Sequence, residues 1–467
     1  MNATVLRVEL KRSVAPWAGA VALASALAFL CLLNGEWQGG TTAWTAQWTT
    51  LALWTRYPTA YLWPLAVGLG ALQGLRDHRS KIADLLTSTP RPARHRAAAT
   101  AGALALTLAS AFALVVLVGA VQVVADTQYT QFGWLPISLI GALFLVAGAV
   151  LGMGAGRALP SVLTPPAVAV GAFVFTNLMH MAPWGQKETF TAAGFPSTEP
   201  RQLSLLSPTV PEVHRAFVTL SASVHVGQLI WLLGMAATGF ALLVAATPKT
   251  RLIALTPVLA GAALALLVLP SDPRRMYVVD KAATHLVCDG PVCVTRTQQA
   301  RLADLAGPGE EALRLMHSAL GDQAPVSVQE DATVLPDGTM PQWSRETVFF
   351  TFDDDMIATA KGDELTRALI AEGTVPGCVP VGTSGFAVDD AVARNVAVGW
   401  VLGGLQPIPG AQAELLAAEV DDKTRQVWKD LRALPRAEQL SRIDAMRAAA
   451  LSCTGDALKA LTGGTSQ

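Results

Sequence analysis

Long apolar runs occupy most of the first 270 residues, whereas the remaining residues alternate between polar and apolar positions over shorter distances. A helix of about 20 apolar residues crosses a hydrocarbon core of about 30 Å. Runs of about 18 residues or more therefore predict transmembrane helices, and the chain contains seven of them. They cover residues 14–34, 58–75, 97–125, 134–156, 161–182, 220–246 and 252–269.

The fifth run, residues 161–182, is the least regular because it contains Thr164-Pro165-Pro166. Proline lacks a backbone donor and disrupts the interior of a helix, so this run predicts either a full span or a broken, re-entrant segment. The sequence therefore predicts six to seven transmembrane helices.

The residue types inside the seven runs restrict the mechanism and the packing. The runs contain no Asp, Glu, Lys or Arg, which argues against a carrier driven by an ion gradient. Glycines spaced as G-x-x-x-G at Gly70 and Gly74, and again at Gly148 and Gly152, predict close helix contacts through small residues.

The second part of the chain has the pattern of a soluble domain. Short β-rich segments such as MYVVD, HLVC, VCVT and TVFFTF predict strands. Helices are expected near residues 362–372, 389–405, 411–419 and 424–453. The expected fold class is an all-α membrane domain over residues 1–270, followed by a soluble α+β extracytoplasmic domain over residues 271–467.

Composition and charge support this division and orient the chain. The mean hydropathy is +0.40 and only 15% of residues are charged, as in membrane proteins. The net charge is −1, but residues 1–270 carry +8 and the remainder −9. Lys and Arg favour cytoplasmic loops, which predicts a cytoplasmic N-terminus, a retained first run and an extracytoplasmic C-terminal domain. The basic residues that orient the chain are Arg7, Lys11, Arg12, Arg76, Arg79, Lys81, Arg91, Arg94, Arg96, Arg157, Lys249 and Arg251.

Four of the five cysteines lie in the C-terminal part, which is consistent with disulfides in an oxidising compartment. Cys288 and Cys293 flank an Asp-Gly-Pro turn that would bring their sulfurs together. Cys378 and Cys453 then form the second predicted pair. The alternatives are four free thiols or a metal site, although no C-x-x-C or cluster of histidines supports zinc.

Motifs for enzymatic chemistry are sparse. The chain contains no G-x-x-x-x-G-K-[ST] phosphate loop and no H-E-x-x-H, and its GTSGF segment is not G-x-S-x-G. The one dense carboxylate group is Asp353-Asp354-Asp355, which could bind Ca²⁺ or Mg²⁺. We interpret it as a solvated turn and predict no metal site, no catalytic residue, no cofactor in this chain and no nucleic-acid partner.

The loop between the second and third runs combines charge with a short helical pattern. Apolar residues of LRDHRSKIADLLTS can share one helix face, with the charges on the other, and Pro90 would end the helix. One interpretation is a solvated loop that obeys the positive-inside rule, and the other is a docking helix for a soluble partner. The residues proposed for docking are Arg76, Asp77, Arg79, Lys81, Ile82, Leu85 and Leu86.

The N-terminal segment VLRVELKRS, the first two spans, this loop ending in ADLLTSTPRPARHR and the Ala/Leu-rich third span resemble the type-2 ATP-binding-cassette permease family. The resemblance covers residues 1–250. It implies that residues 76–88 form a coupling helix that enters a cleft of a separate ATPase subunit, and that residues 5–13 form an interfacial helix. It also implies a dimer, with a second copy or with a paralogous permease.

These expectations predict a permease subunit of an ATP-driven exporter in a lipid bilayer, with ATP and Mg²⁺ bound by the partner ATPase. A path without fixed charges suits a hydrophobic or amphiphilic substrate. Arg outnumbers Lys by 25 to 9, which is typical of GC-rich bacteria and predicts the bacterial plasma membrane. The alternative is a membrane-anchored sensor or enzyme whose activity lies in residues 271–467.

Overall fold

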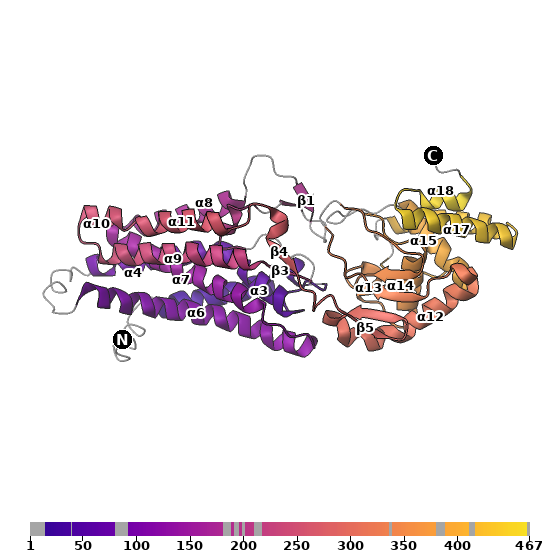
Figure 1. Ribbon diagram of the computed structural model, residues 1–467, viewed down its shortest axis with the longest axis horizontal. Coiled ribbons are helices and arrows are strands. Elements are labelled where there is room, and N and C mark those ends of the chain that lie inside the picture. The colour runs from indigo at the N-terminus through magenta and orange to yellow at the C-terminus, as the bar shows by residue number, and fades with distance from the viewer. Residues whose placement is uncertain are drawn as a thin grey trace.

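The computed structural model describes residues 15–38, 40–79, 92–180, 188–190, 196–198, 201–209, 217–335, 339–379, 388–410 and 416–464. A helical bundle, which we call the helical domain, and a smaller α/β domain lie at opposite ends of its longest axis (Figure 1). The main hydrophobic core of the helical domain runs from Ala15 to Met276, and that of the α/β domain from Val292 to Leu461. The first core thus extends beyond the boundary predicted at residue 270.

A helix forms at each predicted apolar run. The helices of this domain are α2 (Ala15–Leu32), α3 (Trp48–Arg56), α4 (Thr59–Arg79), α6 (Ala93–Asp126), α7 (Trp134–Ala158), α8 (Thr164–His180), α9 (Ala222–Val244), α10 (Pro248–Ile253) and α11 (Thr256–Val268). Among the described residues, five segments are long and apolar enough to cross a bilayer: Ala15–Leu32, Arg94–Asp126, Trp134–Ala158, Ala222–Val244 and Pro248–Val268. These segments indicate a membrane protein.

The other two predicted spans are also helical but do not belong to this group of five. Helix α4 ends in a charged turn that contains Arg76, Asp77 and Arg79. Helix α8 has 17 residues and is shorter than each of the five segments. Helix α8 is not broken at its prolines, because Pro165 and Pro166 occupy its first turn, where no intrahelical donor is needed. The helix therefore begins at Thr164, later than the predicted run.

The G-x-x-x-G prediction is confirmed at the contact between α4 and α7. A methyl group at Gly70 or Gly74 would stand 2.1 Å from a backbone carbonyl oxygen of α7. In the opposite direction, a methyl group at Gly152 would stand 2.0 Å from the Val67 carbonyl oxygen of α4. Each helix thus supplies glycines that admit the backbone of the other, and side chains would prevent this approach.

The α/β domain contains a four-stranded sheet in the order β5-β6-β7-β8. The strands are β5 (Leu286–Asp289), β6 (Val292–Thr295), β7 (Ser327–Glu330) and β8 (Thr347–Phe350). Strands β5 and β6 form the predicted hairpin, with Gly290 at φ +56° in its turn, and β6, β7 and β8 are parallel. Helix α12 (Leu302–Leu320) connects β6 to β7 and packs on the sheet.

Helices complete the α/β domain after the last strand. They are α13 (Asp355–Ala358), α14 (Asp363–Thr374), α15 (Val388–Leu402), α16 (Ala417–Arg432), α17 (Arg436–Ser452) and α18 (Ala457–Thr462). The single helix predicted over residues 424–453 is wrong, because Pro435 ends α16 and stands directly before α17. The helix predicted over residues 411–419 is described only from residue 416, and there it belongs to the start of α16.

Short strands lie between the two domains. Strand β1 (Glu188–Phe190) pairs with β2 (Pro196–Thr198), and β3 (Val218–Leu220) pairs with β4 (Tyr277–Val279). Strand β4 was predicted within the α+β domain, but its partner precedes α9. The pairing therefore ties the segment after α11 back to the start of α9.

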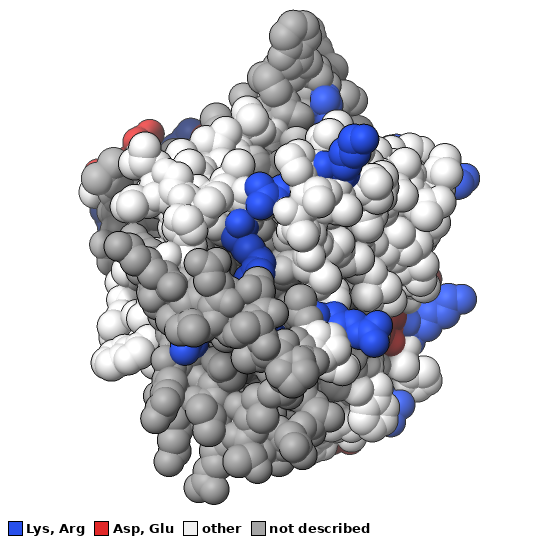
Figure 2. Space-filling model, turned by 90° about the vertical axis from the view of Figure 1, so that its left-hand side faces the viewer, with Lys and Arg blue, Asp and Glu red and all other residues white. Residues whose placement is uncertain are grey.

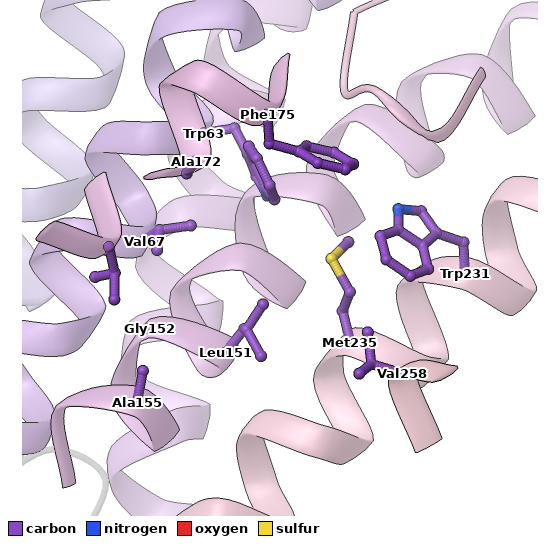
Figure 3. A pocket seen from close by; sticks show the side chains of 11 residues that line it. Trp63, Val67, Leu151, Gly152, Ala155, Ala172, Phe175, Trp231, Met235 and Val258 are labelled. Carbon is purple, nitrogen blue, oxygen red and sulfur yellow. The ribbon is translucent and has the colours of Figure 1, made fainter. Parts of the chain in front are cut away.

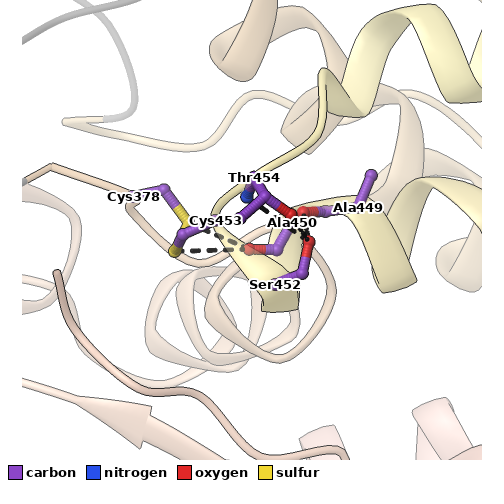
Figure 4. Close-up of a disulfide and its surroundings, with 6 residues drawn as sticks. All are labelled: Cys378, Ala449, Ala450, Ser452, Cys453 and Thr454. Carbon is purple, nitrogen blue, oxygen red and sulfur yellow. Dashed lines mark hydrogen bonds between the residues drawn. A yellow bond between two sulfur atoms is a disulfide. The ribbon is translucent and has the colours of Figure 1, made fainter. Parts of the chain in front are cut away.

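Both predicted disulfides are present in the structure. Cys288 and Cys293 face each other across the β5–β6 hairpin. Cys453 follows the last turn of α17 and bonds to Cys378, which follows α14 (Figure 4). Cys31, in α2, is a free and exposed cysteine.

The second disulfide should contribute more stability than the first, because a longer closed loop restricts the unfolded chain more. The bridged residues are 75 positions apart in one case and 5 in the other. Replacing Cys378 and Cys453 by serine should lower the free energy of unfolding by about 4 kcal/mol, against about 2 kcal/mol for Cys288 and Cys293. Urea unfolding of the full chain in detergent measures both losses, and an equal or larger loss at the hairpin would contradict the prediction.

Candidate functional site

Basic side chains gather at the end of the helical domain that is farthest from the α/β domain (Figures 1 and 2). They come from the end of α4, the start of α6, the end of α7 and from α10. Those that the structure describes are Arg76, Arg94, Arg96, Arg157, Lys249 and Arg251. We call this surface the basic end. Loops that are far apart in the sequence thus present the same charge on one face.

The predicted docking residues begin on this surface. Arg76, Asp77 and Arg79 belong to the last turn of α4, so the first residues of the helix predicted over 76–88 continue the second span. Arg76 is half-buried there. Lys81, Ile82, Leu85 and Leu86 lie outside the described residues. Helix α4 can therefore carry a displacement at the basic end directly into the bundle.

An apolar cavity of about 330 Å³ lies inside the bundle between α4, α7, α8, α9 and α11 (Figure 3). Trp63, Phe175 and Trp231 form its aromatic wall, with ring centroids 5.8 Å apart for the first pair and 6.5 Å for the second. Gly152 and Ala155 of α7 line its opposite end. The volume is at the lower end of the range of small-molecule pockets, roughly 300–1,000 Å³.

Residues 201–209 pack on Trp231, which belongs to the aromatic wall of the cavity, and we call them the plug. The plug contains η2 (Ser204–Leu206), whose three residues are buried. The Trp231 indole N–H donates to the Leu206 carbonyl oxygen at 3.1 Å. The Gln202 amide nitrogen donates to two carbonyl oxygens of the α11 end, both at 2.6 Å. The plug is thus held between α9 and α11.

Arg56 fixes the plug from within the bundle, and it is fully buried. Its guanidinium donates to the Gln228 side-chain oxygen at 3.3 Å and to the Pro208 carbonyl oxygen at 3.1 Å. It also lies 5.6 Å from the centre of the Phe144 ring. Gln228 in turn donates to the Leu205 carbonyl oxygen at 2.9 Å. These bonds offset part of the cost of burying this charge, for which no carboxylate of the described residues forms an ion pair.

The three consecutive aspartates do not converge on one point. Asp354 caps α13 and accepts from the Met356 backbone N–H at 2.8 Å. Asp353 accepts from the Thr41 backbone N–H and hydroxyl, both at 2.6 Å. Asp355 occupies the first turn of α13. Within the described ranges, no group of three or more His, Cys, Asp or Glu residues is placed to hold a metal ion.

Asp353 instead connects the two domains, because Thr41 lies in the loop after α2. Gly40, at φ +70°, precedes this contact, and a side chain there would stand 2.7 Å from an Asp353 oxygen. Tyr129, in the loop after α6, forms a second link: the Arg296 guanidinium lies 5.9 Å from the centre of its ring, and its hydroxyl donates to the Asp280 carboxylate at 2.8 Å. Burial and the Asp280 carboxylate both raise the pKa of Tyr129. The α/β domain is thus held against the loops opposite the basic end.

Two buried carboxyl groups in the α/β domain have displaced pKa values. Burial raises the pKa of Glu330 to about 7, although the Thr295 N–H donates to it at 2.7 Å. Burial also raises the pKa of Glu372 to about 8, and the Arg394 guanidinium, 4.0 Å away, only partly opposes this shift. One Glu372 oxygen has no hydrogen-bond partner among the described residues. Both groups therefore hold protons more tightly than exposed carboxyls do.

Glu372 should make the α/β domain less stable as the pH rises. Its folded pKa of about 8 exceeds its ordinary value of 4.5, so the folded state binds the proton more tightly. Its contribution to the free energy of unfolding is fully present below the unfolded pKa of 4.5. The contribution is lost as the pH rises from 4.5 to about 8, by up to about 1.4 kcal/mol per pH unit. Glu372→Gln should flatten this slope, as measured by hydrogen exchange of the α14 amides corrected for intrinsic rates. Glu364→Gln, at an exposed position of α14, is the control. An equal pH dependence of stability in the wild type, Glu372→Gln and Glu364→Gln would contradict the prediction.

No family model, curated protein or solved structure matches this chain.

The basic loops could be recognised in the sequence, whereas the cavity, the plug and the burial of Arg56 could not. The plug belongs to a Pro-rich stretch between the fifth and sixth runs, outside every predicted span. Its burial depends on bonds to residues far away in sequence, such as that between Pro208 and Arg56. The one sequence feature that could have indicated the burial of Arg56 is its position between Trp54 and the second apolar run.

Proposed function

We propose that this chain is the permease subunit of an ATP-driven exporter for a hydrophobic or amphiphilic substrate. The observation that supports this proposal best is the arrangement of the two ends of the bundle. Basic residues at three loops share one end, and the α/β domain lies at the other (Figures 1 and 2). A soluble motor could reach the bundle at the basic end without competing with the α/β domain.

Charge and disulfides support one orientation of this arrangement. Lys and Arg near span ends favour the cytoplasm, so the basic end is the cytoplasmic one in our proposal. The disulfides Cys288–Cys293 and Cys378–Cys453 lie in the opposite domain and require an oxidising compartment to persist. The membrane is then the bacterial plasma membrane, with the α/β domain on its outer side.

The motor in this proposal is a separate ATPase subunit that binds ATP and Mg²⁺, because this chain has no phosphate loop. The ATPase contacts Arg76, Asp77 and Arg79 at the end of α4 and the residues that follow them. Since α4 also supplies Trp63 and Val67 to the cavity, a movement of its end reaches the cavity through one helix. A second copy or a paralogous permease completes the transport path, as the family resemblance implies.

One observation favours the alternative of a membrane-anchored sensor or enzyme. Glu330 and Glu372 are buried carboxyl groups with raised pKa values, and such groups are frequent at functional sites. In that case the chemistry would lie in the α/β domain, and the bundle would serve as its anchor.

Affinity purification of the tagged full chain from its native membranes distinguishes the two functions. An exporter subunit should recover an ATPase in stoichiometric amount, and substrate-dependent ATP hydrolysis should follow reconstitution. Recovery of the chain without any ATPase, under conditions that preserve its dimer, would contradict transport and favour the alternative.

A further inference from the structure

The cavity is lined by apolar and aromatic residues, and several of them reach the surface of the bundle. Leu151, Phe175 and Val258 line it and are only half-buried, so the cavity opens outward from the helical domain. Helix α8 packs against α4, and α11 packs against α9, and both helices contribute to the lining. The opening therefore lies on the side of the bundle that carries α8 and α11.

The surface around this opening matches the hydrocarbon core of a bilayer. Val170 of α8 and Leu259 of α11 expose 60% and 68% of their surface, respectively, and Leu267 of α11 exposes 82%. None of the described residues that line the cavity is charged. A helix with large exposed apolar side chains is stable where lipid covers it, so lipid hydrocarbon bathes the opening.

The aromatic wall bounds the cavity toward the α/β domain, and the plug packs on Trp231 beyond it. Bonds from Trp231, Gln228 and Gln202 hold the plug in place. A solute from the outer aqueous side would have to displace these bonds and leave buried carbonyl groups without donors. Lateral access from the bilayer requires no such loss.

We propose that the cavity binds the hydrocarbon tail of a membrane amphiphile, which reaches it sideways from the bilayer on the side of α8 and α11. A flexible tail can leave the lipid phase and pack against Trp63, Phe175 and Trp231 without losing a hydrogen bond. This inference names the substrate class of the exporter and in that respect rests on the function proposed above.

A photo-reactive fatty acid with a diazirine in the middle of its tail tests this inference. The full chain is reconstituted into phosphatidylcholine vesicles without any ATPase, irradiated, and its adducts are mapped by mass spectrometry. We expect adducts at Met235 and Leu151, inside the cavity. Val258→Trp should reduce them about tenfold because the larger ring overfills the space that the tail occupies.

Leu259→Trp is the matched control, because it places the same ring on the next residue of α11, outside the set that lines the cavity. It should leave the adducts at Met235 unchanged. Adducts confined to outward-facing residues such as Leu264 and Leu267, or equal labelling in both variants, would overturn the inference. Preferential labelling of the cavity by a water-soluble diazirine would also overturn it.

The same assay separates this inference from the transport function. The variant in which Arg76, Arg79 and Lys81 are replaced by glutamate should keep the cavity adducts even if it no longer binds an ATPase. Loss of tail labelling in a protein that still couples to its ATPase would reject the tail site alone. Retained labelling in a protein that never binds an ATPase would reject the exporter and keep the lipid site.

Discussion

Replacing Arg76, Arg79 and Lys81 together by glutamate is expected to abolish association with the ATPase subunit. The change reverses three charges at and just beyond the end of α4. Placing like charges across an interface costs several kcal/mol, so we expect affinity to fall by about 100-fold or more. Co-purification from membranes and substrate-dependent ATP hydrolysis measure the loss.

The matched control is Lys249→Glu in α10, an exposed residue at the basic end but outside the docking loop. This variant should co-purify with the ATPase nearly as well as the wild type. Undiminished binding and turnover in the triple variant would refute the docking role of the loop. Equal losses in both variants would show a general charge effect of the basic end instead of a specific contact.

Gly152→Ala is expected to destabilise the helical domain strongly, although it adds only one methyl group. The new methyl group would stand 2.0 Å from the Val67 carbonyl oxygen, so α4 and α7 would have to separate along their contact. Because the neighbour is backbone and cannot rotate away, we expect a loss of about 3 kcal/mol or more. The thermal midpoint of the full chain in detergent, followed by size-exclusion chromatography, measures the loss.

Gly171→Ala provides the control for Gly152→Ala. Gly171 lies in α8, and apart from its chain neighbours and the backbone of its own helix, no atom of the described residues lies within 4 Å of the position that its methyl group would take. Alanine also favours helix over glycine, so this variant should be as stable as the wild type or slightly more stable. Similar losses in the two variants would show that the close contact of α4 and α7 is not what stabilises the bundle.

Local pattern predicted the helices of the bundle well, because the length of an apolar run nearly fixes the length of a membrane helix. Helices α2 and α7, for example, begin and end within a few residues of the predicted runs. The hairpin of Cys288 and Cys293 could also be predicted from neighbouring residues, because a turn and its two flanking cysteines define it. The pair Cys378–Cys453 followed once the hairpin pair was assigned.

Features that depend on contacts between distant segments could not be predicted in the same way. Arg56 is buried because the plug folds back over it and α7 and α9 pack beside it. Arg447 is buried where its guanidinium donates to carbonyl groups of Gly373, Gln323 and Arg345. Neither side chain lies in an apolar run. The break at Pro435, in contrast, was available from the sequence and was missed because the helical pattern continues on both sides of it.

The orientation of the two ends of the bundle is the central claim of this account, and single cysteines test it directly. His95→Cys lies at the basic end and Lys361→Cys lies in the α/β domain, and both positions are exposed. In both variants Cys31 is replaced by serine, and the other native cysteines are paired in disulfides, so the introduced cysteine supplies the thiol that reacts with a maleimide. A membrane-impermeant maleimide added to intact cells should label Lys361→Cys at once and His95→Cys only after permeabilisation. Labelling of His95→Cys in intact cells, with Lys361→Cys protected, would contradict the account.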